Sequence, residues 1–155
     1  MIKPDEAYRR IEWKTLILIG SMLAFGQAMV TTGAAEFLAQ TISHLPGAET
    51  STGLLSYFFL FAVLLTQPMS NQASAAVLVP IALQTALLQG YDPRPFAIII
   101  ALAASCSFIT PLEPASVLIY SAGRYRFMDF VRVGGLLTVL IYFMAITLVP
   151  VIWPV

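Results

Sequence analysis

The chain has 155 residues, of which 59% are hydrophobic and only 10% are charged. Its formal net charge is zero and its mean hydropathy is +0.85, values that favour a membrane protein over a soluble domain. A neutral chain lacks the basic surface that nucleic acid binding requires, and one cysteine with one histidine does not supply a zinc site. The composition therefore predicts an all-α polytopic membrane protein.

The first segments predict a surface helix followed by a membrane crossing. Residues 1–12 are polar and place acidic groups in a first helical turn, which is typical of a short helix at the membrane interface. The apolar stretch that follows is long enough to cross a bilayer, with Trp13 and Lys14 as interface anchors. We expect one transmembrane segment over residues 13–43, loosened at residues 31–33.

A polar tetrapeptide, Met69-Ser70-Asn71-Gln72, interrupts about thirty-five otherwise apolar residues, where polar groups are costly unless a function needs them. The apolar arms at 54–66 and 73–88 would each cover roughly 20 Å as helices, against a hydrocarbon core of about 30 Å. Irregular backbone is tolerated at membrane depth only when it is buried in protein or lines an aqueous cavity. We therefore predict a re-entrant helical hairpin over residues 53–89, with its turn near the midplane.

A second interruption lies in the apolar stretch over residues 95–121. It reads Phe108-Ile109-Thr110-Pro111-Leu112-Glu113-Pro114. Each proline removes a backbone donor and disfavours helical geometry in the residue before it, so carbonyl groups at 107–110 lose their partners. The pattern predicts a broken transmembrane helix with two halves.

The last part of the chain predicts an amphipathic arm and a final span. Residues 123–133 interleave three arginines with aromatic and aliphatic residues, and residues 135–153 are apolar. Cations gather before the first span and in this arm, on one face of the membrane. We expect a cytoplasmic N-terminus and an external C-terminus; this charge bias does not distinguish a re-entrant hairpin from two full spans.

The two interruptions together predict a site for an anion and a cation. The residues that start the second hairpin arm and those after Pro114 present helix N-termini, where unpaired N–H groups favour an anion. The side-chain donors there are Ser70, Asn71, Gln72 and Ser116. Carbonyl groups that end the preceding half-helices, with Thr66 and Asn71, suit Na⁺. Ions that share a cavity stabilise each other's binding, which is the basis of coupled symport.

Four stretches resemble motifs of the divalent-anion:sodium symporter family, which comprises the sodium/sulfate and di- and tricarboxylate transporters. Ser70-Asn71-Gln72-Ala73-Ser74 is similar to the second Ser-Asn-Thr signature of that family. The run from Ser105 to Pro111 is similar to the family's broken helix. Residues 5–13 resemble the entry to its second repeat, and residues 125–130 resemble the arm before its last span.

The resemblance implies that the chain is the C-terminal half of a symporter, the second of two inverted repeats that each hold a re-entrant hairpin and a broken helix. The N-terminal repeat would then be missing, and the complete protein would be a homodimer in an inner or plasma membrane, with an elevator-like or rocking mechanism. By motif matching, the anion would contact Ser70, Asn71 and Gln72. One sodium would be held by Thr66, the Met69 backbone carbonyl, Asn71 and a carbonyl near Ser107.

The sequence leaves open which anion is transported and whether the chain transports it without a partner. Gln72 stands where the family usually has threonine, and the Thr110-Pro111 step is similar to the sulfate-type branch, so sulfate and dicarboxylates both remain candidates. No catalytic constellation or organic cofactor motif is present, which argues against an enzyme. The alternatives to symport are a truncated or split membrane subunit without transport of its own, and a sodium-independent anion channel.

Overall fold

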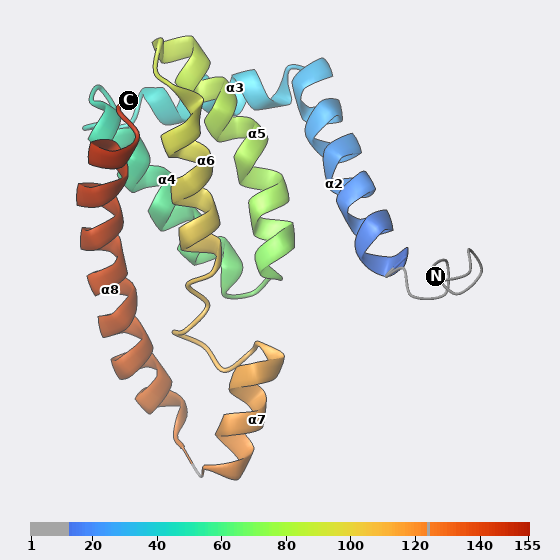
Figure 1. The fold of residues 1–155 in the computed structure, drawn as a ribbon, viewed down its shortest axis with the longest axis vertical. Helices are drawn as coiled ribbons and strands as arrows, with labels where there is room; N and C mark the ends of the chain where they lie inside the picture. Colours follow the sequence, from blue (N-terminus) through green and yellow to red (C-terminus); the bar gives the residue numbers. More distant parts are fainter. Residues whose placement is uncertain (1–12, 124) are drawn as a thin grey trace, which may run out of the picture.

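The computed structural model describes residues 13–123 and 125–155, and every regular element in these ranges is an α-helix (Figure 1). The helices are α2 (Trp13–Thr31), α3 (Ala34–Ser43), α4 (Ser51–Thr66), α5 (Asn71–Gln89), α6 (Pro93–Ala104), α7 (Pro114–Ala122) and α8 (Phe127–Ile152). The predicted all-helical architecture is confirmed. The surface helix predicted at 1–12 lies outside the described residues.

Local sequence signals set the ends of α5 and α6. The Ser70 hydroxyl accepts a hydrogen bond from the Ala73 N–H at 3.2 Å and caps the start of α5. Gly90 ends α5 with a φ of 74°, a left-handed conformation that glycine adopts without strain. The Asp92 carboxylate then accepts from the Arg94 N–H at 2.9 Å and caps α6. These three residues fix where the hairpin begins its second arm and where the next helix starts.

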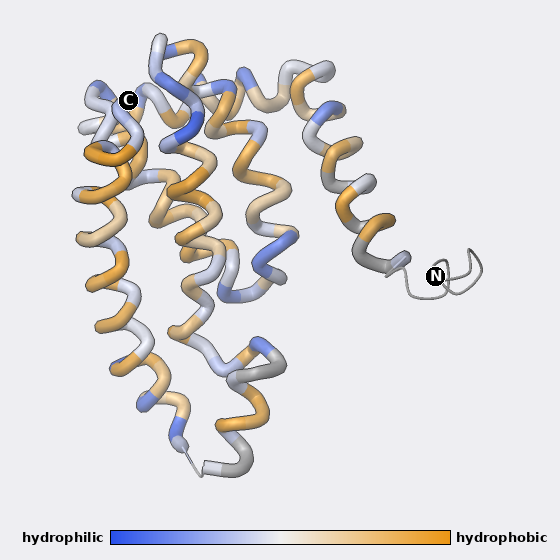
Figure 2. The backbone as a smooth tube through the Cα atoms, viewed as in Figure 1, coloured by the Kyte–Doolittle hydropathy of each residue, from blue (hydrophilic) through white to orange (hydrophobic). Residues whose placement is uncertain are grey.

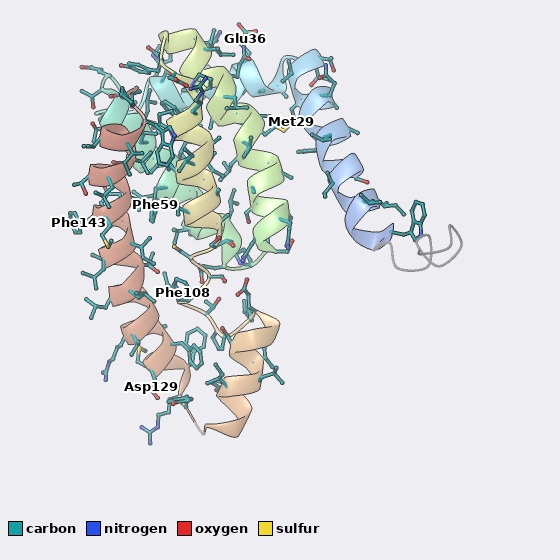
Figure 3. All side chains as sticks on the ribbon, viewed as in Figure 1. Met29, Glu36, Phe59, Phe108, Asp129 and Phe143 are labelled. Carbon is teal, nitrogen blue, oxygen red and sulfur yellow. The ribbon has the colours of Figure 1, made fainter. Side chains whose placement is uncertain are left out.

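The buried core lies among α4, α5 and α6, with α8 packed along one side. The Phe58 ring on α4 meets the Phe96 ring on α6 edge to face, with 5.9 Å between ring centroids. The next residue, Phe59, which is labelled in Figure 3, contacts the Tyr142 ring of α8 edge to face, with 5.3 Å between ring centroids. Aromatic packing of this kind adds to the gain from apolar burial. The hairpin α4–α5 is therefore the centre of the fold.

The outer surface of α8 is apolar rather than polar. Its outward side chains, which include Leu136, Leu140, Phe143 and Val151, are exposed, and Figure 2 shows hydrophobic residues along most of the helix. An apolar exposed face is stable in hydrocarbon and unstable in water. Of the described helices, α5 and α8 are long and apolar enough to cross a membrane, while Ser51–Thr66 and Pro93–Ala104 are shorter apolar helices.

The last span differs from its prediction. The sequence predicts a separate arm at 123–133 and a span at 135–153, but α8 runs without a break from Phe127 to Ile152. The helix starts there because the Asp129 carboxylate accepts a hydrogen bond from the Arg126 N–H at 2.8 Å. The Gly134-Gly135 pair lies within this helix, and Gly134 allows close packing against the backbone of Phe108.

The hairpin arms are longer than the sequence indicates. Helix α4 has 16 residues and α5 has 19, or about 24 and 28 Å of helix. The length argument for re-entry therefore does not hold for α5, which starts at its serine cap instead of at residue 73. In Figure 1 the turn between α4 and α5 lies level with the middle of α8, whose first half continues beyond it toward α7.

Gly134→Ala is expected to destabilise the protein, because a Cβ at this position would overlap the backbone carbonyl of Phe108. We expect a loss of about 1–3 kcal/mol, typical of overpacking, in thermal unfolding measured in detergent. Gly135→Ala is the matched control, since a Cβ there meets no heavy atom within 4 Å. Equal unfolding midpoints for the two variants would contradict the close approach of α8 to Phe108.

Candidate functional site

The two polar interruptions predicted from the sequence lie against each other. We call residues 67–70, between α4 and α5, the hairpin turn, and residues 105–113, between α6 and α7, the unwound segment. Gln67 of the turn donates from its amide nitrogen to the Cys106 carbonyl at 3.2 Å, and its amide oxygen accepts from the Thr110 hydroxyl at 3.1 Å. Segments about forty residues apart in sequence therefore form one polar region.

Three oxygen atoms converge at the base of the hairpin turn. The Thr66 hydroxyl lies 2.6 Å from the Asn71 amide oxygen and 2.9 Å from the Ala104 carbonyl oxygen. We call these three atoms the oxygen cluster. Thr66 is only 1% exposed, so water does not compensate for an unmet polar contact there.

The oxygen cluster contains one hydroxyl proton, from Thr66, and two oxygen atoms that could accept it. A threonine hydroxyl has one proton, so it can donate to Asn71 or to Ala104 but not to both. The second contact needs the Asn71 amide turned so that its nitrogen donates, or a cation among the oxygens. Unwound carbonyls at the end of a half-helix are a recurrent sodium-binding arrangement in transporters. The cluster is therefore chemically suited to a small hard cation.

The carbonyl in the cluster comes from Ala104, earlier than the sequence predicts. Helix α6 ends at Ala104, where the Ser105 and Cys106 N–H groups turn back to the carbonyls of residues 102 and 103. The Ser105 hydroxyl also bonds to the Ala101 carbonyl at 3.0 Å. Serine side chains compete with the backbone in this way and weaken a helix. The helix ends before the prolines, and the Ala104 carbonyl is left without a helical partner.

The other two predicted sodium ligands lie in the hairpin turn and in the unwound segment. Met69 is in the hairpin turn with an exposed side chain, and its N–H donates to the Leu65 carbonyl at 3.2 Å. Ser107 is buried in the unwound segment, and its hydroxyl has no hydrogen-bond partner among the described residues. A buried hydroxyl without a protein partner costs free energy. Neither residue is in direct contact with Thr66 by a described hydrogen bond.

The residues predicted to bind the anion lie at the start of α5. Ser70 is exposed and keeps its hydroxyl proton free to donate, because its oxygen accepts the capping bond. The first intrahelical bond runs from the Ser74 N–H to the Ser70 carbonyl, so the Asn71 and Gln72 N–H groups precede the helical ladder. Gln72 is exposed, and Asn71 is half-buried against Thr66. This helix end can therefore offer several donors to one anion.

The sequence predicts that α7 contributes its N-terminus and Ser116 to the anion site. Helix α7 begins at Pro114, and Figure 1 draws this end toward the hairpin turn. Pro114 has no N–H to donate, so the free donors of that end are the next two N–H groups. Ser116 lines a cavity of about 420 Å³ between α7 and α8, whose other lining residues include Tyr125, Asp129 and Phe130. An aspartate that lines the same cavity disfavours an anion there, and the place of Ser116 in the anion site stays a prediction.

Sequence reasoning missed four groups of this region: the Ala104 carbonyl, the Gln67 amide, the Thr110 hydroxyl and the Ser74 hydroxyl. Ser74 is fully buried three residues after Asn71, and no described residue bonds to its hydroxyl. Gln67 and Thr110 carried a usable signal, since each is a polar residue directly before a proline within an apolar stretch. The Ala104 carbonyl carried none, because its role depends on where α6 ends.

Comparison with known proteins assigns the family. The citrate transporter family (CitMHS) matches residues 1–103 of the chain. The chain is 32% identical over 154 residues to an uncharacterized transporter, YfbS, of Escherichia coli, which covers 99% of the chain and 25% of that protein. It is 28% identical over 133 residues to sodium/sulfate cotransporter 1 of Chlamydomonas reinhardtii, covering 84% of the chain and 15% of the relative.

A third relative is named for another anion. The sodium-dependent dicarboxylate transporter SdcS of Staphylococcus saprophyticus is 25% identical over 130 residues, covering 83% of the chain and 25% of that protein. The chain spans about a quarter or less of the length of these three relatives. The resemblance to sodium/sulfate and dicarboxylate transporters is confirmed, and it extends over most of the chain. The chain belongs to the citrate transporter family of membrane transport proteins.

Proposed function

We propose that the chain forms the second half of a sodium-coupled symporter for a divalent anion. The oxygen cluster of Thr66, Asn71 and Ala104 carries the proposal, because it pairs a cation-type donor set with a helix N-terminus directly beside it. A sodium ion at the cluster would place positive charge next to the free N–H groups of α5. Each ion then favours binding of the other, which is the thermodynamic requirement for coupling.

The position of the hairpin turn supports a midplane site. If α8 crosses the membrane, the level of the turn in Figure 1 is near the middle of the bilayer. The turn is then irregular backbone at membrane depth, and the unwound segment covers it on one side. We therefore propose a re-entrant hairpin because its turn lies level with the middle of α8. The lengths of the two arms do not carry this proposal.

The anion is proposed to be sulfate or a di- or tricarboxylate. The relatives named for sodium/sulfate cotransport and sodium-dependent dicarboxylate transport support both sodium coupling and this substrate class. Ser70, Asn71 and Gln72 would donate to the anion from the start of α5. We further propose that the first repeat supplies the opposite wall of the site, that the complete protein is a homodimer, and that the N-terminus is cytoplasmic.

The second candidate function is that of a split or structural subunit. It is favoured because the chain spans only 25% of the length of two of its relatives. Uptake into proteoliposomes separates the candidates. Labelled sulfate, succinate and citrate are each offered with and without an inward sodium gradient, to this chain alone and then to this chain co-reconstituted with the first repeat of a relative. We call whichever of these shows uptake the competent preparation.

Each outcome of the uptake measurement has one meaning. Sodium-dependent uptake in either preparation is the expected result and identifies the anion. Uptake that ignores the sodium gradient would indicate an anion channel and contradict symport. No uptake in either preparation would favour a subunit without transport of its own.

A further inference from the structure

Gln67 links the hairpin turn to the unwound segment. Its amide nitrogen donates to the Val63 carbonyl at 3.0 Å and to the Cys106 carbonyl at 3.2 Å, and its amide oxygen accepts from the Thr110 hydroxyl at 3.1 Å. Both donor protons and the acceptor are therefore used, on two elements at once. Among the described residues, Gln67 makes all the side-chain hydrogen bonds that join the turn to residues 105–113.

The only part of the oxygen cluster outside the hairpin is the Ala104 carbonyl, at the last residue of α6 and directly before the unwound segment. Ala104 is two residues before Cys106, so a shift of the Cys106 backbone moves the Ala104 carbonyl relative to Thr66. On the opposite side, Phe108 lies against Gly134 of α8. The segment is thus fixed by α8 on one side and by Gln67 on the other.

We propose that Gln67 is a positioning residue that sets the sodium affinity of the oxygen cluster. This inference rests on the proposed function. Gln67 has no described hydrogen bond to the three oxygens; it holds the backbone that follows Ala104, whose carbonyl oxygen lies 2.9 Å from the Thr66 hydroxyl oxygen. Outer-shell partners that orient metal ligands typically change affinity by about 10- to 100-fold when they are removed. Without Gln67, sodium must order the segment when it binds, and part of its binding free energy is lost.

The test replaces Gln67 by methionine, which has similar length and no amide. We expect Gln67→Met to raise the half-saturating sodium concentration for uptake by about tenfold, while the maximal rate changes by less than about twofold. Gln84→Met is the matched control: Gln84 is also half-buried, lies on α5 beside α2, and has no side-chain hydrogen bond to a described residue. A purely structural effect would lower the maximal rate and leave the sodium dependence unchanged.

Thr110→Val provides an independent variant that removes one hydrogen bond and keeps the glutamine. We expect it to raise the half-saturating sodium concentration by about threefold, the size of one net hydrogen bond. The double variant should be no worse than Gln67→Met, because both changes release the same segment. If Gln67→Met does not fold, Thr110→Val against wild type carries the test.

Thermal unfolding in NaCl and in choline chloride gives a second readout in the same samples. Wild type and Gln84→Met should be stabilised by sodium, and Gln67→Met should need about ten times more sodium for the same shift. Equal sodium dependence in wild type, Gln67→Met and Thr110→Val would overturn the positioning role alone. A wild type that responds to sodium in neither measurement would overturn the proposed function, and the inference with it.

Discussion

Asn71→Leu is expected to abolish sodium-dependent uptake, with a loss of at least about 100-fold in the competent preparation. Leucine matches the size of asparagine but removes both the amide oxygen that faces the Thr66 hydroxyl and the donor at the start of α5. The loss should exceed the roughly 10- to 100-fold effect of outer-shell residues, because Asn71 would touch both ions. Initial rates of labelled anion uptake, with and without a sodium gradient, measure it.

The control for Asn71 is Gln89→Leu, which changes a polar residue at the opposite end of the same helix. Gln89 is exposed and distant from the hairpin turn, so we expect normal uptake. Sodium-dependent uptake by Asn71→Leu at the wild-type rate would remove Asn71 from both sites.

Thr66→Val is expected to raise the half-saturating sodium concentration by about tenfold or more, with a smaller effect on the anion. The replacement keeps the shape and removes only the hydroxyl that contacts Asn71 and Ala104. Loss of this oxygen leaves the cluster with two ligands and leaves the Ala104 carbonyl unpaired in a buried position. Uptake measured over a range of sodium concentrations at saturating anion reports the change.

Thr85→Val is the matched control for Thr66. Thr85 is also buried, but its hydroxyl bonds only to the Ile81 carbonyl of its own helix at 2.8 Å. Valine should therefore be tolerated there without a change in sodium dependence. A rise of equal size in both variants would mean that helix packing, and not the oxygen cluster, controls sodium.

The polar residues in apolar stretches were the most informative part of the sequence. They located the hairpin turn and the unwound segment, because unpaired polar groups at membrane depth need a functional or structural partner. In the structure the Thr66 hydroxyl oxygen lies 2.6 Å from the Asn71 amide oxygen, so two of the predicted sodium ligands are neighbours. Whether sodium binds there remains a prediction that the variants above test.

Other features could not be read from the sequence because they depend on tertiary contacts. Helix α6 ends at Ala104, before the prolines, where the Ser105 and Cys106 N–H groups turn back to the carbonyls of residues 102 and 103. The arm predicted at 123–133 and the span predicted at 135–153 form one continuous helix, and Gly134 within it packs on the Phe108 carbonyl of a distant segment. Ser116 lies beside Asp129 in a cavity that is defined only once α7 and α8 are placed together.

Equilibrium binding of radiolabelled sodium to the purified competent preparation tests the central claim most directly. With sulfate or succinate present, wild type should bind sodium saturably, and Asn71→Leu and Thr66→Val should each lose binding at the same sodium concentration. Wild-type binding should also tighten when the transported anion is added, as coupling requires. Saturable binding that is identical in wild type and both variants would contradict a sodium site at the oxygen cluster.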